Sequence, residues 1–441
     1  MLTAVPNLPK LSRNWPLMLM AGAAGCALGI VVFALCGTSW VIAALTQTPR
    51  PVAALVVGLG LFASVTPSPL YRTYSVLWHF SPLTLTLIYA TYAFGVLATL
   101  LLAGRASDDA GRRPVLLAAL GLLMASTVLF MFASSAAWLF VARGLQGLAT
   151  GAAISAASAA LLDLHPRRDP AGVGLTNGVA SAVGLGLGIL VSSAIVQLGY
   201  ATRVLPYVVL FTLFALAFAG VYLMPEPVED RRGFRFTIER PTVPPVARHR
   251  FVLAGLAVLS SWSIGGLFFS LGPQLGAHLF ASSNAIVEAI GIIALTGAAA
   301  LSQVVFGRAA PWAGASAGSI GLAAGTVLIV AATRTDSSAE YVIGTLVAGA
   351  GFGIAFLGGL RALVAVIPPE QRAATMAAFY VVAYASLSLP AILAGIVVTP
   401  LGLEPTFELF GAVIAGLALV VAGMALRTRP RSPARVVAAA A

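Results

Sequence analysis

A short charged segment at residues 104–114 interrupts an otherwise apolar sequence and reads Gly-Arg-Ala-Ser-Asp-Asp-Ala-Gly-Arg-Arg-Pro. Glycine is favoured where a tight turn needs positive φ or where two backbones approach closely. The carboxylate of Asp108 can bind a helix N-terminus, and the guanidinium groups of Arg112 and Arg113 can bind carboxylates or helix C-termini. A solvated charged turn is the simpler interpretation, but solvation alone does not require this order of residues.

A second candidate is an arginine inside an apolar segment, where residues 142–147 read Ala-Arg-Gly-Leu-Gln-Gly. An arginine at the centre of a membrane helix costs about 2.5–3.5 kcal/mol on insertion scales, so its presence indicates a function by default. Arg143 either has a buried polar role or extends to the outer interface, since it lies about two turns into the segment. Arg361 also has two interpretations, lining a pathway or lying near the inner boundary.

Residues that usually perform catalysis are sparse in the apolar segments. None of the 14 acidic residues lies at the middle of a segment, and the four histidines lie in turns. Cys26 and Cys36 fall in one N-terminal stretch, which excludes a disulfide framework and a cysteine-based metal site. We therefore expect no metal site and no cofactor, and we predict that the chain is not an enzyme.

The composition sets the class of protein. Of the 441 residues, 59% are apolar and only 9% are charged, whereas a soluble domain is about 25% charged. A soluble enzyme, a disordered chain and a nucleic-acid-binding protein are excluded on this ground. The net charge of +11 is explained more simply by basic loops that fix the orientation of membrane helices.

Apolar runs of about 20 residues, the length of a membrane-spanning helix, predict an all-α membrane protein with twelve spans. They lie at about 52–76, 82–104, 114–134, 137–163, 171–198, 204–224, 251–277, 284–306, 311–332, 340–366, 373–399 and 405–426. Residues 16–46 form a further apolar stretch, predicted as an extra N-terminal hydrophobic helix. Its alternatives are a signal-like segment and an upstream extension from an early start codon.

The distribution of arginine supports twelve spans. The loops on one side contain 17 arginines and the turns on the other contain three, which fits the rule that basic loops remain inside. The three are Arg72, Arg203 and Arg334. The 17 are Arg105, Arg112, Arg113, Arg167, Arg168, Arg231, Arg232, Arg235, Arg240, Arg248, Arg250, Arg308, Arg372, Arg427, Arg429, Arg431 and Arg435.

The two groups of six spans also align with each other. At an offset of 203, residues 104–106 match residues 307–309, and at an offset of 202, Gly147 and Gly151 match Gly349 and Gly353. Two pseudo-symmetric halves are typical of transporters that bind their substrate near the middle of the membrane. We predict an N-terminal extension (1–50), a six-helix half (51–224), a cytoplasmic linker (225–250), a second six-helix half (251–427) and a basic cytoplasmic tail (428–441).

The charged segment resembles the signature loop of the major facilitator superfamily, Gly-x-x-x-Asp-Arg-x-Gly-Arg-Arg/Lys, and departs from it at Asp109, where the family usually has a basic residue. The matching residues are Gly104, Asp108, Gly111, Arg112 and Arg113. The resemblance implies a latch between the halves in the outward-facing state, in which the aspartate caps a helix of the second half. It also implies that Arg112 or Arg113 pairs with Asp163, the acid at the inner end of the fourth span.

Three further segments support the resemblance, which covers about residues 52–427. Arg143 and Gln146 resemble an Arg-x-x-Gln-Gly motif in the family's fourth span, where the arginine is thought to assist proton transfer. The fifth span resembles loosely a glycine motif of the family's antiporters, and small-residue packing explains it equally well. Its glycines are Gly178, Gly184 and Gly188.

A cavity with aromatic residues and few charges would suit amphipathic or weakly cationic substrates. Pro67 and Pro69 free backbone carbonyls in the first span, which is tolerated where the backbone faces a cavity. The tyrosines could instead belong to an aromatic belt at the membrane interface, an interpretation that fits Tyr71 well and Tyr92 less well. The candidate residues of a substrate or proton pathway are Tyr71, Tyr92, Arg143, Gln146, Glu288, Arg361 and Tyr384.

The resemblance implies a drug-efflux-like secondary transporter of the cell (inner) membrane, a monomer that exports small amphipathic molecules by proton antiport. Without a Gly-x-x-x-x-Gly-Lys-[Ser/Thr] loop, ATP hydrolysis is not predicted. Glu288 is the best candidate for the titrating group, and its alternative is an interfacial carboxylate. The other functions considered are metabolite uptake, facilitated diffusion and a sensor that does not transport.

Overall fold

The computed structural model describes residues 50–104, 106–165, 169–228 and 240–429. Within these ranges the regular structure is helical throughout, and no strand is present. The predicted extra helix at 16–46 lies outside the described residues, as do Arg105, part of the linker and most of the tail.

The helices follow the predicted segments closely. The first six segments form α2 (Arg50–Val65) with η1 (Ser68–Leu70) and α3 (Tyr71–Trp78), α4 (Pro82–Leu102), α6 (Arg112–Met131), α7 (Ala136–Asp163), α8 (Pro170–Leu198) and α9 (Leu205–Leu223). The short helix α5 (Ala106–Ala110) lies in the charged segment.

The remaining segments form α10 (Arg248–Leu279), α11 (Ala285–Glu288), α12 (Ile290–Phe306), α13 (Pro311–Thr335), α14 (Ser338–Val364), α15 (Arg372–Leu401) and α16 (Leu403–Arg427). The short helices η2 (Pro245–Ala247) and η3 (Pro369–Gln371) precede α10 and α15. Eleven spans in the described residues are long and apolar enough to cross a membrane. The eighth predicted segment is divided instead, because α12 has 17 residues and α11 precedes it.

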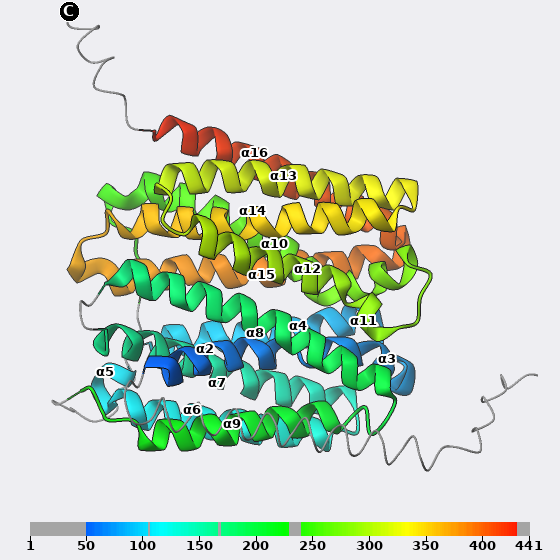
Figure 1. The fold of residues 1–441 in the computed structure, drawn as a ribbon, viewed down its shortest axis with the longest axis horizontal. Helices are drawn as coiled ribbons and strands as arrows, with labels where there is room; N and C mark the ends of the chain where they lie inside the picture. The colour runs from blue at the N-terminus through cyan, green and yellow to red at the C-terminus, as the bar shows by residue number, and fades with distance from the viewer. Residues whose placement is uncertain (1–49, 105, 166–168, 229–239, 430–441) are drawn as a thin grey trace, which may run out of the picture.

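The helices lie roughly parallel, with α13 and α16 at one side of the bundle and α6 and α9 at the other (Figure 1). The helices α2–α9 pack mainly against one another, and so do α10–α16. The largest contacts between these two sets join α4 to α15 and α8 to α12. These two contacts therefore form the middle of the bundle.

The two ends of the bundle differ in charge. One end, here called the arginine-rich end, contains α5 and the residues Arg112, Arg308, Arg361 and Arg427. The opposite end contains α3, α11 and most of the described acidic residues of the second set of helices. The asymmetry predicted from the sequence thus corresponds to two faces of one helical bundle.

Glycines in corresponding positions let helix backbones meet. A Cβ at Gly147 of α7 would overlap the carbonyl oxygen of Tyr92 on α4, and one at Gly151 would lie 2.9 Å from the carbonyl oxygen of Val96. In the second set of helices, a Cβ at Gly349 of α14 would overlap the backbone of α12, and one at Gly353 would lie 2.6 Å from a carbonyl there. The glycines that align by sequence therefore perform the same packing task twice.

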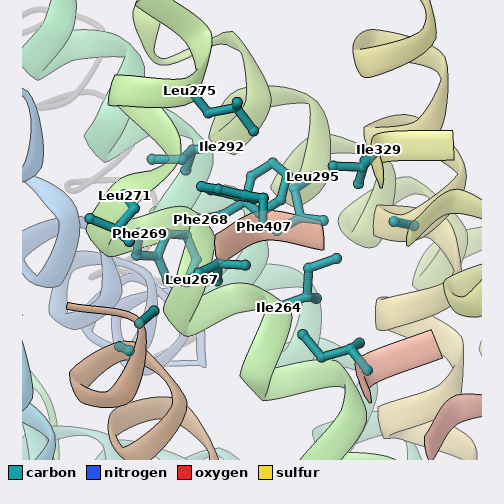
Figure 2. Packing of buried hydrophobic residues seen from close by; sticks show 14 of the residues in the cluster. Ile264, Leu267, Phe268, Phe269, Leu271, Leu275, Ile292, Leu295, Ile329 and Phe407 are labelled. Carbon is teal, nitrogen blue, oxygen red and sulfur yellow. The ribbon is translucent and has the colours of Figure 1, made fainter. Parts of the chain in front are cut away.

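The core of the second set is formed by aromatic and branched side chains. Figure 2 shows Phe268 of α10 packed beside Phe407 of α16, with Leu295 of α12 next to them. The ring of Phe268 also stacks on Tyr341 of α14 at a centroid distance of 6.1 Å. These contacts hold α10, α12, α14 and α16 together, and the same buried cluster includes Val65, Tyr89 and Ile189 of the first set.

Candidate functional site

Arg143 is completely buried in the first set of helices, with 0% of its surface exposed. Its Nε and Nη2 donate to the hydroxyl of Tyr71, and its Nη1 donates to Ser64 O and Gln146 Oε1, both at 2.7 Å. The guanidinium carbon lies 5.5 Å from the ring centroids of Tyr71 and of Tyr92. Arg143 is therefore held inside the bundle, and it does not extend to an interface.

Proline explains why α2 can receive these side chains. The helix ends at Val65, and Pro67 cannot donate a backbone N–H to the carbonyl of Ala63. Gln146 Nε2 donates to that carbonyl at 3.0 Å, and Arg143 binds the next one. Carbonyls in the last turn of a helix need such donors, and a cation is favoured there.

Aromatic side chains of the second set face this cluster. The ring of Trp262 (α10) meets those of Tyr384 (α15) and Phe356 (α14) at centroid distances of 5.4 and 5.7 Å. All three side chains are half-buried. Tyr89 of α4 belongs to the buried cluster against which Trp262 and Tyr384 pack, and α4 packs against α15. The structure thus brings together the helices that carry Tyr92 and Tyr384, which are far apart in sequence.

The charged segment forms a compact cluster at the arginine-rich end. Arg112 Nε donates to Asp163 Oδ2 at 2.9 Å, and its Nη1 donates to Ser107 Oγ and Asp108 Oδ1. Gly111 adopts a φ of 100°, which an L side chain rarely adopts. Of the two arginines left open by the sequence, Arg112 makes the pair with Asp163. Asp108 binds Arg112, and 49% of its side chain is exposed.

Arg113 has a different environment, since its guanidinium lies 5.0 Å from the ring centroid of Tyr222 on α9. This distance is suitable for a cation–π contact. Arg113 therefore provides a matched comparison for Arg112 in the same turn.

Glu226, which follows α9, holds the same loop and was not identified from the sequence. Its two carboxylate oxygens accept hydrogen bonds from the backbone N–H groups of Arg112 and Arg113, each at 2.9 Å. These are free donors in the first turn of α6, and a carboxylate is favoured at a helix N-terminus. Since 113 or more residues separate the partners, no local sequence pattern indicates this cap.

Replacing Glu226 with alanine is expected to lower the free energy of unfolding by about 1–3 kcal/mol, because two helix donors lose their acceptor. Thermal unfolding of the detergent-solubilised protein measures the effect. Glu370→Ala is the control, since Glu370 is exposed. Equal unfolding midpoints for Glu226→Ala and the parent would contradict a capping role.

Arg361 lies near the loop that joins α12 to α13. Its Nη1 donates to the carbonyls of Gly307 and Ala309, the latter at 3.1 Å. Gly307 and Ala309 are the sequence counterparts of Gly104 and Ala106. The structure therefore places Arg361 at the arginine-rich boundary, apart from the Arg143 cluster, which corresponds to the second of its two interpretations.

Glu288 links the two sets of helices at the opposite end. Its carboxylate pairs with Arg72 of α3, and 11% of the glutamate side chain is exposed. Nearby, Gln197 Oε1 of α8 accepts a hydrogen bond from the backbone N–H of Ala285 at 2.9 Å. These bonds join α3 and α8 to α11, so this part of the opposite end is closed.

The glycines of α8 lie at helix contacts. A Cβ at Gly184 would overlap Gly58 of α2, and one at Gly188 would lie 2.6 Å from the carbonyl of Phe62. A Cβ at Gly178 would overlap the side-chain oxygen of Gln303 on α12. Close packing accounts for all three glycines, and Gly178 lies at the contact between the two sets of helices.

One group of three potential metal ligands occurs among the described residues, at the opposite end. His278 Nε2 lies 2.6 Å from Glu404 Oε1, and Asp336 is near both. The side chains of His278 and Asp336 are at least half exposed. The contact between His278 and Glu404 explains the arrangement without an ion, so the group does not by itself indicate a metal site.

Comparisons with known proteins agree with this architecture. Residues 54–333 match the sequence profile described as Major Facilitator Superfamily. Multidrug resistance protein MdtL of Escherichia coli O45:K1 (strain S88 / ExPEC) is 32% identical over 100 residues, which is 22% of this chain and 26% of MdtL. The match therefore spans about a quarter of the length of that relative.

Two solved structures share the fold. A POT family transporter in complex with a thioalcohol-conjugated peptide aligns with a TM-score of 0.68 and 13% identity, covering 86% of this chain and 96% of that one. The human organic anion transporter MFSD10 (TETRAN) aligns with a TM-score of 0.60 and 18% identity, covering 85% and 98%.

Proposed function

This chain belongs to the major facilitator superfamily, and we propose that it is a secondary active transporter that exports small amphipathic or drug-like molecules. Its transporter fold and its multi-pass insertion in a membrane follow from the family and from the apolar helices. The export of drug-like molecules is supported by the short match to MdtL. The bacterial source of that relative supports a place in the inner membrane.

One observation supports a pathway through the middle of the bundle. The Arg143 cluster of α2, α3, α4 and α7 and the aromatic cluster of α10, α14 and α15 are joined by the contact between α4 and α15. Burying a cation such as Arg143 in an apolar bundle costs free energy, so a buried cation usually has a function. We assign Tyr71, Tyr92, Arg143, Gln146 and Tyr384 to this pathway.

We further propose that residues 51–224 and 251–427 move as two six-helix halves, with α11 and α12 together forming the eighth of twelve spans. Substrate would reach the middle of the bundle from each side in turn. Two features support this movement: the corresponding glycine contacts of α7 and α14, and the bonds of α11 to α3 and α8, which close the opposite end. The bond between Arg112 and Asp163 would hold the loop of the latch. A monomer is sufficient for this scheme.

Glu288 is the proposed site of proton coupling, because protonation would remove its charge and release Arg72. Glu288→Gln is expected to abolish accumulation driven by a proton gradient, while exchange of substrate without a gradient persists. Uptake with and without an uncoupler measures the difference. Glu408→Gln is the matched control, since Glu408 pairs with Arg334 at the same end but within the second half. Gradient-driven accumulation that survives Glu288→Gln excludes Glu288 as the coupling residue.

A second candidate function is passage of a metabolite without coupling. The absence of a carboxylate from the middle of the spans, seen in the sequence, favours it. Uptake of fluorescent amphipathic dyes by inverted membrane vesicles distinguishes the two. The proposed exporter accumulates dye when a proton gradient is applied and loses it when an uncoupler is added. Uptake that is insensitive to the uncoupler supports facilitated passage, and vesicles that match empty-vector vesicles contradict export of this class of molecule.

A further inference from the structure

The positive charge of Arg143 is buried, and no carboxylate of the described residues binds it. Its hydrogen-bond partners are a phenol, a backbone carbonyl and an amide oxygen, all of which are uncharged. The described carboxylates lie at the ends of the bundle. Those at the arginine-rich end are Asp108, Asp109, Asp163, Asp169, Glu226 and Glu370, and those at the opposite end are Glu288, Asp336, Glu340, Glu404 and Glu408.

The partners of Arg143 fix its position but leave its charge in place. Its four hydrogen bonds use both N–H groups of Nη1, the one of Nε and one of Nη2. A guanidinium has five such donors, so the second N–H of Nη2 takes part in none of these four hydrogen bonds. In a medium of low dielectric constant, an uncompensated cation attracts an anion and repels a second cation over several ångströms.

The aromatic cluster supplies the complementary surface. Trp262, Phe356 and Tyr384 are half-buried, and the ring of Trp262 meets the rings of the other two. Tyr92, whose ring is 5.5 Å from the guanidinium, lies on α4, the helix that packs against α15 of this cluster. An aromatic or aliphatic body can therefore lie against the second half while a charged group approaches Arg143.

We propose that the transported molecules are amphipathic organic anions, whose negative group is neutralised by Arg143 and whose apolar body lies against Trp262, Phe356 and Tyr384. This inference rests on the transport function proposed above, and it differs from the weakly cationic substrates that the aromatic content suggested. Export of an anion and import of a proton carry charge in the same direction. A membrane potential that is negative inside therefore drives both.

The test compares probes of the same shape and opposite permanent charge. Full-length protein in proteoliposomes with a potassium diffusion potential is offered 2-naphthalenesulfonate and 2-naphthyltrimethylammonium, with benzene and biphenyl pairs as smaller and larger versions. For at least one pair, the sulfonate is expected to be transported at least about tenfold faster than its partner. Arg143→Gln is expected to reduce that rate to the level of protein-free liposomes, and Arg143→Lys to retain part of it.

Arg334→Gln is the control, because it removes an exposed arginine at the opposite end. Ammonium probes that are transported as fast as the sulfonates, or faster, overturn the anion proposal and leave the transporter function standing. A sulfonate rate unchanged by Arg143→Gln also overturns the proposal. Transport of none of the probes by the parent protein contradicts both proposals. If Arg143→Gln fails to elute as a single species, the anion proposal is judged by the charge preference of the parent protein and by the transport rate of Arg143→Lys.

Discussion

Replacing Gly147 with valine is expected to destabilise the fold strongly, because the valine side chain would enter the backbone of α4. A Cβ at this position already overlaps the carbonyl oxygen of Tyr92 and lies 3.1 Å from the Cα of Gly95. Backbone atoms cannot move aside as a flexible side chain can, so α4 and α7 must separate. We expect a loss of about 3 kcal/mol in the free energy of unfolding, measured by thermal unfolding and by size-exclusion elution.

Gly121→Val on α6 is the matched control. A Cβ at Gly121 has no neighbouring atom within 4 Å, and the substitution has the same intrinsic effect on a helix. Gly121→Val is expected to elute and unfold like the parent protein. Equal behaviour of the two valine variants would show that the contact between α4 and α7 does not require glycine.

Removing Arg112 is expected to disorganise the loop cluster and to reduce transport by more than about tenfold. Arg112 binds Asp163, Asp108 and Ser107 together, and 10% of its side chain is exposed. Hydrogen bonds to charged groups contribute about 1.5–3 kcal/mol each when one partner is removed. Uptake by inverted vesicles and thermal unfolding are measured for Arg112→Ala, Asp163→Ala and the double variant.

The double variant of Arg112 and Asp163 tests whether the two residues act through the bond between them. If Arg112 and Asp163 act through one contact, the effect of the double variant is much smaller than the sum of the single effects. Arg113→Ala is the control within the same turn, because Arg113 contacts the ring of Tyr222 instead. Additive effects, or an equally large loss in Arg113→Ala, would show that the pair does not hold the latch.

The sequence predicted the helices well because each is a long apolar run with clear breaks. The predicted segment 137–163 corresponds to α7 (Ala136–Asp163), and 311–332 corresponds to α13 (Pro311–Thr335). Length and hydropathy determine such a span directly. The segment at 284–306 differs because Asn284 caps a short helix, α11, which ends at Glu288 before α12 begins.

Contacts between distant spans could be anticipated only in part. The paired roles of Arg112 and Asp163 follow from the resemblance of the loop, but the choice between Arg112 and Arg113 required the structure. The pair between Arg72 and Glu288 joins residues 216 positions apart, and no local pattern links them. Hydropathy shows which segments are buried, whereas helix rotation and close packing decide which polar side chains meet.

The Arg143 cluster shows the same limit. Arg143, Gln146, Tyr71 and Tyr92 were each selected as single residues from composition and motif. Their meeting depends on the end of α2 before Pro67, which exposes two carbonyls, and on the close contact of Gly147 with α4. The tryptophan and phenylalanine of the aromatic cluster were not selected, because aromatic residues are common in membrane helices and carry no specific spacing.

The most direct test of alternating access measures both ends of the bundle in one preparation. Spin labels are placed in a Cys26→Ser/Cys36→Ser background, one pair at Val76 and Ser283 at the opposite end and the other at Asp109 and Arg308 at the arginine-rich end. Movement of two halves around Arg143 predicts that acidification lengthens the first distance and shortens the second. In Glu288→Gln, neither distance is expected to change on acidification. Two distances that stay constant, or that change in the same direction, would contradict alternating access in this protein.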